Sequence, residues 1–429
     1  MGYHAVNLVL HLISILLCWV ALGPLVPASS RLIATAIFAL HPFQAETVNY
    51  VFARSTLLAT VLCLAALASW TRGLHWPAVA WFAAALLAKE ECAAFPVFLL
   101  LLWLAKRGDR KDLAPLALMF VAALAAGIRV MLVARSTPGS GAGAQAAVTS
   151  QTYLITQGVV ILRYLRMLVI PWGFTVDPDI RIPPISIGVA AWAGVALLAG
   201  TAIFQIKNRR AGFWFIAGLI LLLPSSSIFP ATDLAADRRM YLPMIGFAAC
   251  VGLLLERVRP AFLIPVLILL GGLSLVRTST WRTEESLWTD AVEKAPAKVR
   301  PRIQLARAVE PARAIPILEE AKQLAPNDPA AASEEGRVYL GLGRPAEALM
   351  QFGRALALAP RDPANLNNRG AALLALQQRE AARADFERAL SIDPCQFDAR
   401  LNLKRLGVAV SIPPQCRYTA EQVAELTEK

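Results

Sequence analysis

The sequence has few charged residues for its length. Asp, Glu, Lys and Arg make up 17% of its 429 residues, while 57% are hydrophobic and the mean hydropathy is +0.53. An ordinary soluble domain is about 25% charged and about 45–50% apolar. This shortage of charge excludes a wholly soluble protein and indicates an integral membrane protein with a further domain attached.

Cysteine and acidic residues are also scarce. The six cysteines form no CxxC motif and no Cys–His pair at metal-ligand spacing, which excludes the usual structural zinc sites. The 42 Lys and Arg outnumber the 30 Asp and Glu, so the net charge is +12. Much of this excess stands in short loops between apolar runs, without the interleaved aromatics of nucleic-acid surfaces. We therefore predict no nucleic-acid partner.

Long apolar runs are what the sequence has in abundance. A spanning helix needs about 20 apolar residues, or fewer where neighbours shield it. The first run lacks a basic segment ahead of it and is long, so no cleavable signal peptide is predicted. The runs cover residues 3–22, 31–41, 46–71, 75–88, 92–105, 113–134, 187–206, 211–223, 240–256 and 260–276.

One further run, 151–170, carries Arg163 and Arg166 in its middle, and each arginine costs about 2.5–3.5 kcal/mol at a helix centre. We interpret residues 135–186 as one external loop that contains an interfacial amphipathic helix. The basic clusters then all lie on the cytoplasmic side, as the positive-inside rule requires. These clusters are Lys106–Lys111, Lys207–Arg210 and Glu256–Arg259.

The prediction is thus a multi-pass domain over residues 1–278 with about ten spanning helices, in a cytoplasmic (inner) membrane, followed by an external C-terminal region. In this topology four polar segments share the outer face: residues 38–55, 89–91, 135–186 and 233–241. Charged groups beside apolar helices are costly in lipid and usually face a cavity or each other. We expect these segments to form one external polar site.

Charged helices replace the apolar runs after Val276. Pro326, Pro360 and Pro394 recur every 34 residues, the period of tetratricopeptide repeats, and each closes the second helix of a repeat. The pattern predicts an α-solenoid over residues 279–429, so that the whole chain is all-α. The repeats are expected near 297–328, 329–362 and 363–396, with a capping helix at 397–407.

The repeat pattern suggests two further features. Solenoids of this kind bind peptides in their concave face, where Asn365, Asn367 and Asn368 could hydrogen-bond an extended peptide; the alternative is ordinary solvated helix polarity. Cys395 and Cys416 would lie in an oxidising compartment if this half is external, and a disulfide would then tie the tail to the last repeat.

Several short motifs, in order along the chain, resemble the transmembrane-and-TPR protein O-mannosyltransferases, and in particular their bacterial relatives. This family belongs to the glycosyltransferases of GT-C type. The similarity covers nearly the whole chain. The matching segments are Tyr3–His11, Ala39–Glu46, Arg54 with the apolar helix after it, Ala88–Glu90, Asp237–Pro243 and Trp281–Asp290.

The resemblance implies a GT-C-like membrane domain, a polyprenyl-phosphate sugar donor, transfer on the external or periplasmic side, and a protein acceptor handled by the repeats. Family members begin with a further helix and an acidic external loop. Here no acidic residue precedes Glu46, so we expect a chain that lacks this helix and loop. Two hypotheses follow: a glycosyltransferase, or a catalytically inactive membrane scaffold whose repeats bind proteins.

Sugar transfer of the inverting type needs a carboxylate to deprotonate the acceptor hydroxyl, and cations or a metal to stabilise the leaving phosphate. Glu46 and Asp237 are the predicted catalytic carboxylates; Glu46 could instead cap the helix that begins there. A divalent cation is a candidate cofactor. The residues predicted to bind the donor phosphate or line the pocket are His41, Arg54, Lys89, Glu90, Arg238, Arg239 and Tyr241. Lys89 and Glu90 could instead simply pair, and the last three residues could instead be structural anchors.

Overall fold

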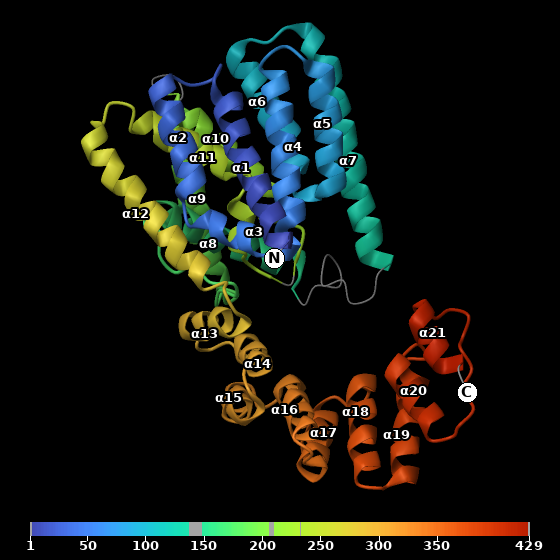
Figure 1. The fold of residues 1–429 in the computed structure, drawn as a ribbon. Helices are drawn as coiled ribbons and strands as arrows, with labels where there is room; N and C mark the ends of the chain where they lie inside the picture. Colours follow the sequence, from blue (N-terminus) through green and yellow to red (C-terminus); the bar gives the residue numbers. More distant parts are fainter. Residues whose placement is uncertain (1, 137–147, 206–209, 232, 428–429) are drawn as a thin grey trace. The chain divides into compact units, whose positions relative to one another are not determined.

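The computed structural model describes residues 2–136, 148–205, 210–231 and 233–427. The chain divides into two compact units, Met1–Arg282 and Thr283–Lys429, close to the division predicted after residue 278. The described residues contain helices and no strand, so the all-α prediction is confirmed. The two units are considered separately (Figure 1).

Apolar helices build the first unit. Among its described residues, six helices are long and apolar enough to cross a membrane: α1, α4 extended by a short 3-10 turn, α7, α8, α9 and α12; four more apolar helices there are shorter. The bounds are α1 Gly2–Leu22, α2 Ala28–Leu40, α3 Phe43–Asn49, α4 Arg54–Trp70, α5 His75–Ala88, α6 Phe95–Lys106, α7 Leu113–Ser136, α8 Ser150–Val169, α9 Ile185–Gln205, α10 Ala211–Leu222, α11 Met244–Leu254 and α12 Pro260–Ser279.

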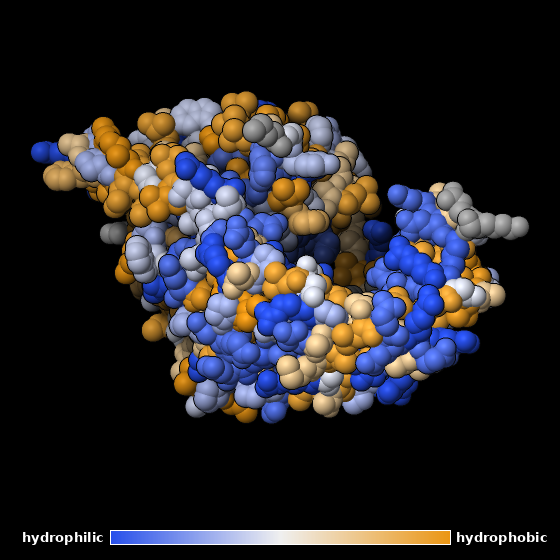
Figure 2. All heavy atoms as spheres, turned by 60° about the horizontal axis from the view of Figure 1, so that its bottom comes forward, coloured by the Kyte–Doolittle hydropathy of each residue, from blue (hydrophilic) through white to orange (hydrophobic). Residues whose placement is uncertain are grey.

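The long helices α7, α9 and α12 lie at the outside of this bundle, and the short helices α10 and α11 lie inside it. Only 11% of the α7 and α12 spans and 17% of the α9 span are buried. Leu124, Leu197 and Ile268 on these helices are each more than 60% exposed, and Figure 2 shows hydrophobic side chains over much of the bundle surface. The short helices α10 and α11 instead bury most of their side chains, and α11 packs against both α2 and α10. The outer faces are therefore the ones suited to lipid.

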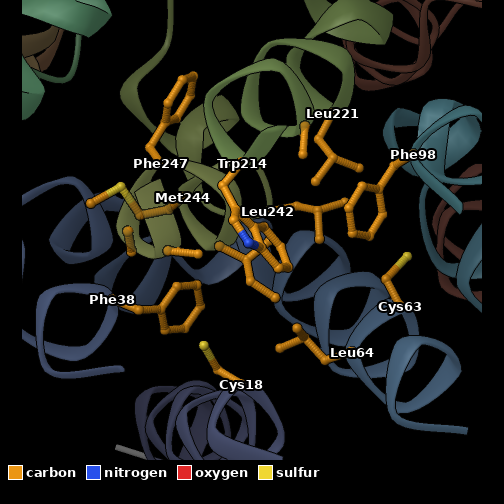
Figure 3. Close-up of a cluster of buried hydrophobic side chains, with 14 of the residues drawn as sticks. Cys18, Phe38, Cys63, Leu64, Phe98, Trp214, Leu221, Leu242, Met244 and Phe247 are labelled. Carbon is orange, nitrogen blue, oxygen red and sulfur yellow. The ribbon is translucent and has the colours of Figure 1, made fainter. Parts of the chain in front are cut away.

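The core of the bundle lies between α1, α2, α4, α6, α10 and α11. Phe38, Phe98, Trp214 and Phe247 fill it together with small thiols such as Cys18 (Figure 3). The four cysteines of this unit are all buried and free, as expected for small apolar side chains.

One predicted apolar run is divided in the structure, and the placement of a second run relative to the membrane stays a prediction. The run 46–71 is divided, because α3 ends at Asn49 and α4 begins at Arg54; Glu46 therefore does not cap a spanning helix. The break between α2 and α3 has a local cause, because Pro42 disfavours helical backbone at His41. The run 151–170 forms the continuous α8, which has the length and composition of a span, so its interfacial placement stays a prediction.

The second unit consists of helix pairs. Asp328 and Asp362 accept hydrogen bonds from Ala330 and Ala364 (both 2.9 Å) and so cap the first helix of two repeats. The following proline occupies the first turn of each helix, where no N–H is needed. The bounds are α13 Glu284–Lys294, α14 Val299–Ala308, α15 Pro311–Leu324, α16 Pro329–Gly341, α17 Pro345–Leu358, α18 Pro363–Ala375, α19 Arg379–Ile392, α20 Phe397–Arg405 and α21 Ala420–Thr427.

Glycines set how closely the paired helices approach. A Cβ at Gly336 would lie 2.7 Å from the Phe352 ring, and one at Gly370 would lie 2.6 Å from the Phe386 ring. Both phenylalanines are completely buried. The 34-residue period therefore reflects a repeated contact in which a ring packs directly on a glycine backbone.

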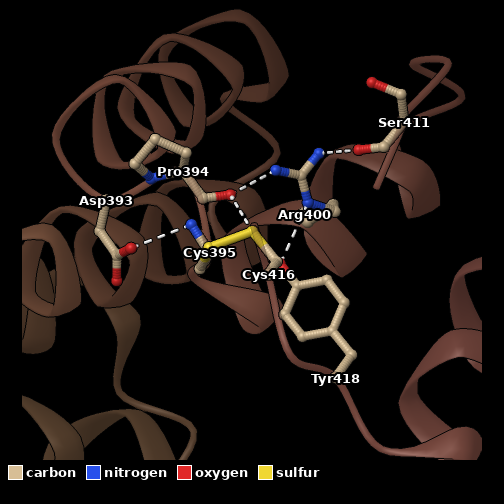
Figure 4. The surroundings of a disulfide bond; sticks show 7 residues. All are labelled: Asp393, Pro394, Cys395, Arg400, Ser411, Cys416 and Tyr418. Atoms are coloured by element: carbon tan, nitrogen blue, oxygen red, sulfur yellow. Dashed lines mark hydrogen bonds between the residues drawn. A yellow bond between two sulfur atoms is a disulfide. The ribbon is translucent and has the colours of Figure 1, made fainter. Parts of the chain in front are cut away.

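A disulfide joins Cys395, after the last repeat, to Cys416 in the C-terminal tail (Figure 4). Arg400 lies beside it and donates hydrogen bonds to the carbonyl oxygens of Pro394 and Ser411 and to the hydroxyl of Tyr418. The tail is thus held to α20 by one covalent bond and by one buried guanidinium.

We predict that Gly246→Ala destabilises the membrane unit. A Cβ at Gly246 would lie 2.5 Å from the backbone nitrogen of Gly218, where α10 and α11 cross, and backbone cannot move aside. Overpacking of this kind costs about 1–3 kcal/mol, so the melting temperature of the purified protein should fall by several degrees. Gly200→Ala on α9 is the matched control, because nothing lies within 4 Å of its added methyl group. Equal melting of the two variants would contradict this packing.

Candidate active site

The short helix α3 carries Glu46 and is held at both ends. At its start, His41 Nδ1 accepts a hydrogen bond from the Phe43 N–H, while Nε2 donates to the carbonyl of Leu168 at the end of α8 (both 3.3 Å). Burial lowers the pKa of His41 to about 4, so the ring is neutral at pH 7. At the end of α3, Asn7 donates to the carbonyl oxygen of Val48 (3.1 Å). His41 therefore positions α3.

Glu46 is buried, with 2% of its side chain exposed. Its Oε1 accepts a hydrogen bond from Nη1 of Arg238 at 2.9 Å, and Arg238 also contacts Asp233 at 3.3 Å. Within the described part of the chain, Oε2 of Glu46 has no hydrogen-bond partner. One oxygen of this carboxylate is thus bound to a cation, and the other can still accept a proton.

Asp237 forms the second pair of the cluster. It lies in a 3-10 turn, η6 (Asp237–Met240), and its Oδ1 accepts a hydrogen bond from Nη1 of Arg163 on α8 at 2.7 Å. Arg163 also donates to the carbonyl of Gly173 at 3.1 Å. Asp237 is 1% exposed, and among the described residues its Oδ2 has no partner. We call Glu46, Asp237, Arg163 and Arg238 the carboxylate–arginine cluster.

The charges of the cluster act on the protonation of Glu46. Burial and the nearby Asp237 charge raise the pKa of Glu46 to about 7, although Arg238 and Arg277 oppose the shift. The pKa of Arg238 is also raised: burial opposes its charge, but attraction to Glu46 and Asp233 outweighs the burial. The protonated form of Glu46 is therefore favoured over a wider pH range than in an exposed carboxylic acid.

Two neighbouring predicted residues serve as internal anchors. Arg239 donates to the carbonyl of Asp233 (2.7 Å) and to the hydroxyl of Tyr153 (3.1 Å). Tyr241 is completely buried, and its hydroxyl lies 2.7 Å from Nδ1 of His11 on α1. Their polar groups are engaged within the bundle, which is the structural alternative left open for them.

The other predicted pocket residues lie outside the carboxylate–arginine cluster. Arg54 stacks over the ring of Tyr3, with 4.9 Å between its guanidinium carbon and the ring centroid. Lys89 contacts Thr56 (2.9 Å) and Glu91 (3.3 Å). Glu90 is exposed.

A small crevice nevertheless lies between the segment around Lys89 and the segment that follows α10. Lys89, Glu91 and Arg239 all line it, and Glu46 does not. The structure therefore brings together residues from two of the predicted polar segments here, while Glu46 pairs with Arg238 elsewhere.

Sequence reasoning missed three charged residues at the site: Arg163, Asp233 and Arg277. Arg277 lies on α12 and is 5% exposed, yet its charge reaches Glu46. For Arg163 a signal was present, because an arginine within an apolar helix usually has a buried partner. In the sequence, Arg163 served only as an argument for the interfacial placement of run 151–170.

The asparagines predicted to bind peptide are engaged within the solenoid. Asn365 is 2% exposed and its Oδ1 accepts from Ser333 on the preceding repeat (2.5 Å). Asn367 is 6% exposed and accepts from Asn402 on α20 (3.0 Å), and its own amide donates to Asn368 (3.3 Å). These side chains join the first helices of successive repeats.

Comparisons with known proteins were made over the whole chain. A family model described as tetratricopeptide repeat matches residues 364–394. A protein O-mannosyl-transferase of Caenorhabditis elegans is 25% identical over 70% of this chain. Protein O-mannosyl-transferase TMTC3 of Homo sapiens is 25% identical over 81% of it. The predicted resemblance is confirmed. The chain spans 46% and 45% of the length of these two O-mannosyltransferase relatives.

Solved structures were also compared. MamA of Desulfovibrio magneticus RS-1 is 20% identical, with 29% of this chain and 72% of that chain covered, at a TM-score of 0.27. Yeast Tom70 is 13% identical, with 88% and 84% covered, at a TM-score of 0.28. These scores are too low to add to the repeat assignment.

We predict that Arg163→Ala destabilises the protein strongly. The change leaves Asp237 as a buried charge without its partner, and breaking a buried ion pair from one side typically costs about 3–5 kcal/mol. The melting temperature of the purified chain measures this. Arg166→Ala, on the exposed side of the same helix, should have little effect. Adding Asp237→Asn to Arg163→Ala should recover part of the loss; no recovery would contradict the pairing.

Proposed function

We propose that the protein is a membrane glycosyltransferase-like enzyme that transfers a sugar from a polyprenyl-phosphate donor to a hydroxyl group of a protein acceptor on the external face. The observation that carries the proposal is Glu46: a buried carboxylate whose pKa is raised to about 7, with one oxygen on Arg238 and the other without a partner among the described residues. The similarity to O-mannosyltransferases supports the class of reaction.

The chemistry assigns a role to each member of the carboxylate–arginine cluster. Glu46 takes the proton of the acceptor hydroxyl on Oε2 while the hydroxyl oxygen attacks the anomeric carbon of the sugar. The bond from that carbon to the phosphate oxygen breaks, and the phosphate leaves with the electron pair. Arg238, which is 23% exposed, can balance the developing charge, as preorganised cations do in phosphate sites. Arg163 and Asp237 hold the turn that carries Arg238.

The cluster supplies its cations as guanidinium groups. No group of three His, Cys, Asp or Glu side chains that could hold a metal ion occurs among the described residues. The proposed reaction therefore routes no step through a divalent cation, and the need for one is decided by measuring transfer with and without a chelator.

The repeats and the tail support an external, protein-directed role. Tetratricopeptide repeats are protein-binding modules, so the proposed acceptor is a protein or peptide held by the second unit. The Cys395–Cys416 disulfide suits an oxidising compartment, such as the periplasm. We therefore propose that the second unit lies on the periplasmic side of the inner membrane.

A specific observation favours the second candidate function, an inactive membrane-anchored scaffold that binds proteins through its repeats. Both carboxylates of the cluster already pair with arginine, Glu46 with Arg238 and Asp237 with Arg163. A network that only fastens α3, α8 and η6 together would have the same pairs. The two candidates differ in one measurable respect, which is whether sugar moves.

We predict that the purified wild-type chain transfers sugar from a polyprenyl-phosphate donor and that Glu46→Gln lowers the rate about 10²–10⁴-fold, because the general base is lost. The wild-type rate should rise with pH up to about 7 and then level off, since only the deprotonated carboxylate acts and its pKa lies there. Radiolabelled donor and a peptide acceptor measure both effects.

Asp109→Asn is the matched control, because Asp109 is an exposed acid far along the chain from Glu46 that caps the turn before α7 and pairs only with the exposed Lys111 among the described residues. It should retain the wild-type rate. Melting temperatures of all three proteins establish that they are folded. A folded wild type that transfers no sugar from any common donor would reject the enzyme and favour the scaffold.

We predict that the Cys395–Cys416 disulfide forms in growing cells if the second unit is external. The two thiols should then resist a maleimide reagent until a reductant is added, and a mass shift of two labels should follow reduction. The four membrane-unit cysteines are buried, so replacing them with alanine or serine removes the background. Labelling of Cys395 and Cys416 without reductant would place this unit in a reducing compartment.

A further inference from the structure

One basic residue from each of three clusters that lie far apart in the sequence lines two adjoining pockets of the membrane unit. Arg210 and Arg257 line the first pocket, which has a volume of about 470 Å³. Arg210 also lines the second, of about 430 Å³, together with Lys106. From the sequence, these clusters are explained by membrane topology alone. That role does not require residues from all three clusters to line the same cavities.

The pockets lie at the end of α2 remote from the carboxylate–arginine cluster. Pro27, which precedes α2, lines the first pocket, whereas His41 follows α2 at its other end. The 13 residues of α2 separate these ends by about 20 Å at 1.5 Å per residue. The pockets are thus a separate site, on the predicted cytoplasmic side.

The cations of the pockets are poorly neutralised. Among the described residues, neither Arg210 nor Arg257 makes a side-chain hydrogen bond or ion pair with another residue. Lys106 donates only to the carbonyl oxygen of Pro24, at 3.4 Å, and its charge is repelled by Arg210. Of the described residues that line the two pockets, Glu256 is the one acidic residue. All three cations are exposed, so an anion can reach them together, and like charges that lie near each other attract anions.

Apolar side chains form the remaining wall. Leu102, Phe213 and Trp214 line the second pocket beside Lys106 and Arg210. A free inorganic anion makes no favourable contact with these apolar side chains. A lipid that carries a phosphate head group and acyl chains matches both kinds of lining, and basic pockets between helices on the cytoplasmic side are a known form of lipid site.

We propose that these two pockets bind the phosphate head group of an anionic phospholipid, with Arg210 shared between them and with Lys106 and Arg257 on either side. The lipid fastens the cytoplasmic ends of α2, α6, α10 and α11 together. This site is independent of the proposed sugar transfer.

The test measures the melting temperature of the full chain in a non-ionic detergent. Phosphatidylglycerol, phosphatidylcholine and inorganic phosphate are titrated separately. Phosphatidylglycerol should raise the melting temperature, while phosphatidylcholine and inorganic phosphate should raise it much less. Arg210→Ala combined with Arg257→Ala should weaken the apparent affinity for phosphatidylglycerol at least about tenfold, because charge-assisted contacts to phosphate are lost.

Arg110→Ala is the matched control: it removes one exposed cation near Lys106 that lines neither pocket. It should bind phosphatidylglycerol as the wild type does. Equal stabilisation by phosphatidylglycerol and phosphatidylcholine would overturn the proposal, and this arm needs only the wild type if the double variant does not fold. Stabilisation by inorganic phosphate equal to that by phosphatidylglycerol would show a free-anion site instead. An unchanged affinity in a folded double variant would also overturn it.

Discussion

The pairing of buried carboxylates with guanidinium groups is the interaction on which the polar end of the bundle depends. Glu46, Arg163 and Asp237 come from segments more than 70 residues apart, and each is largely removed from water. An ion buried without its partner is strongly unfavourable. Each pair therefore requires the chain to bring α3, α8 and η6 to one place. The geometry needed for chemistry at Glu46 and the geometry needed for folding are the same.

Sequence patterns were sufficient for some of this arrangement. The 34-residue period predicted the repeat helices, because the Asp-Pro caps and the glycine–phenylalanine contacts are local or nearly so. Grouping Glu46 with the segment around Arg238 followed from counting spans and basic loops. Both inferences use only spacing along the chain, which the sequence states directly.

Particular partners could not be predicted in the same way. Which carboxylate Arg163 meets depends on how α8 is rotated about its axis, and a row of apolar residues with two arginines does not specify that rotation. For the same reason, the sequence could not predict that Arg54 lies on Tyr3 rather than with Glu46. It also could not predict that Asn365 and Asn367 form hydrogen bonds between repeats, because periodicity identifies the face of a helix but not its neighbours.

The contrast between long outer helices and short inner ones has a consequence for the membrane around them. The inner helices α2, α10 and α11 contain 13, 12 and 11 residues, which is about 16–20 Å of helix, whereas the hydrocarbon layer is about 30 Å thick. In a bilayer that the outer helices span, at least one end of each inner helix therefore lies below the level of the head groups.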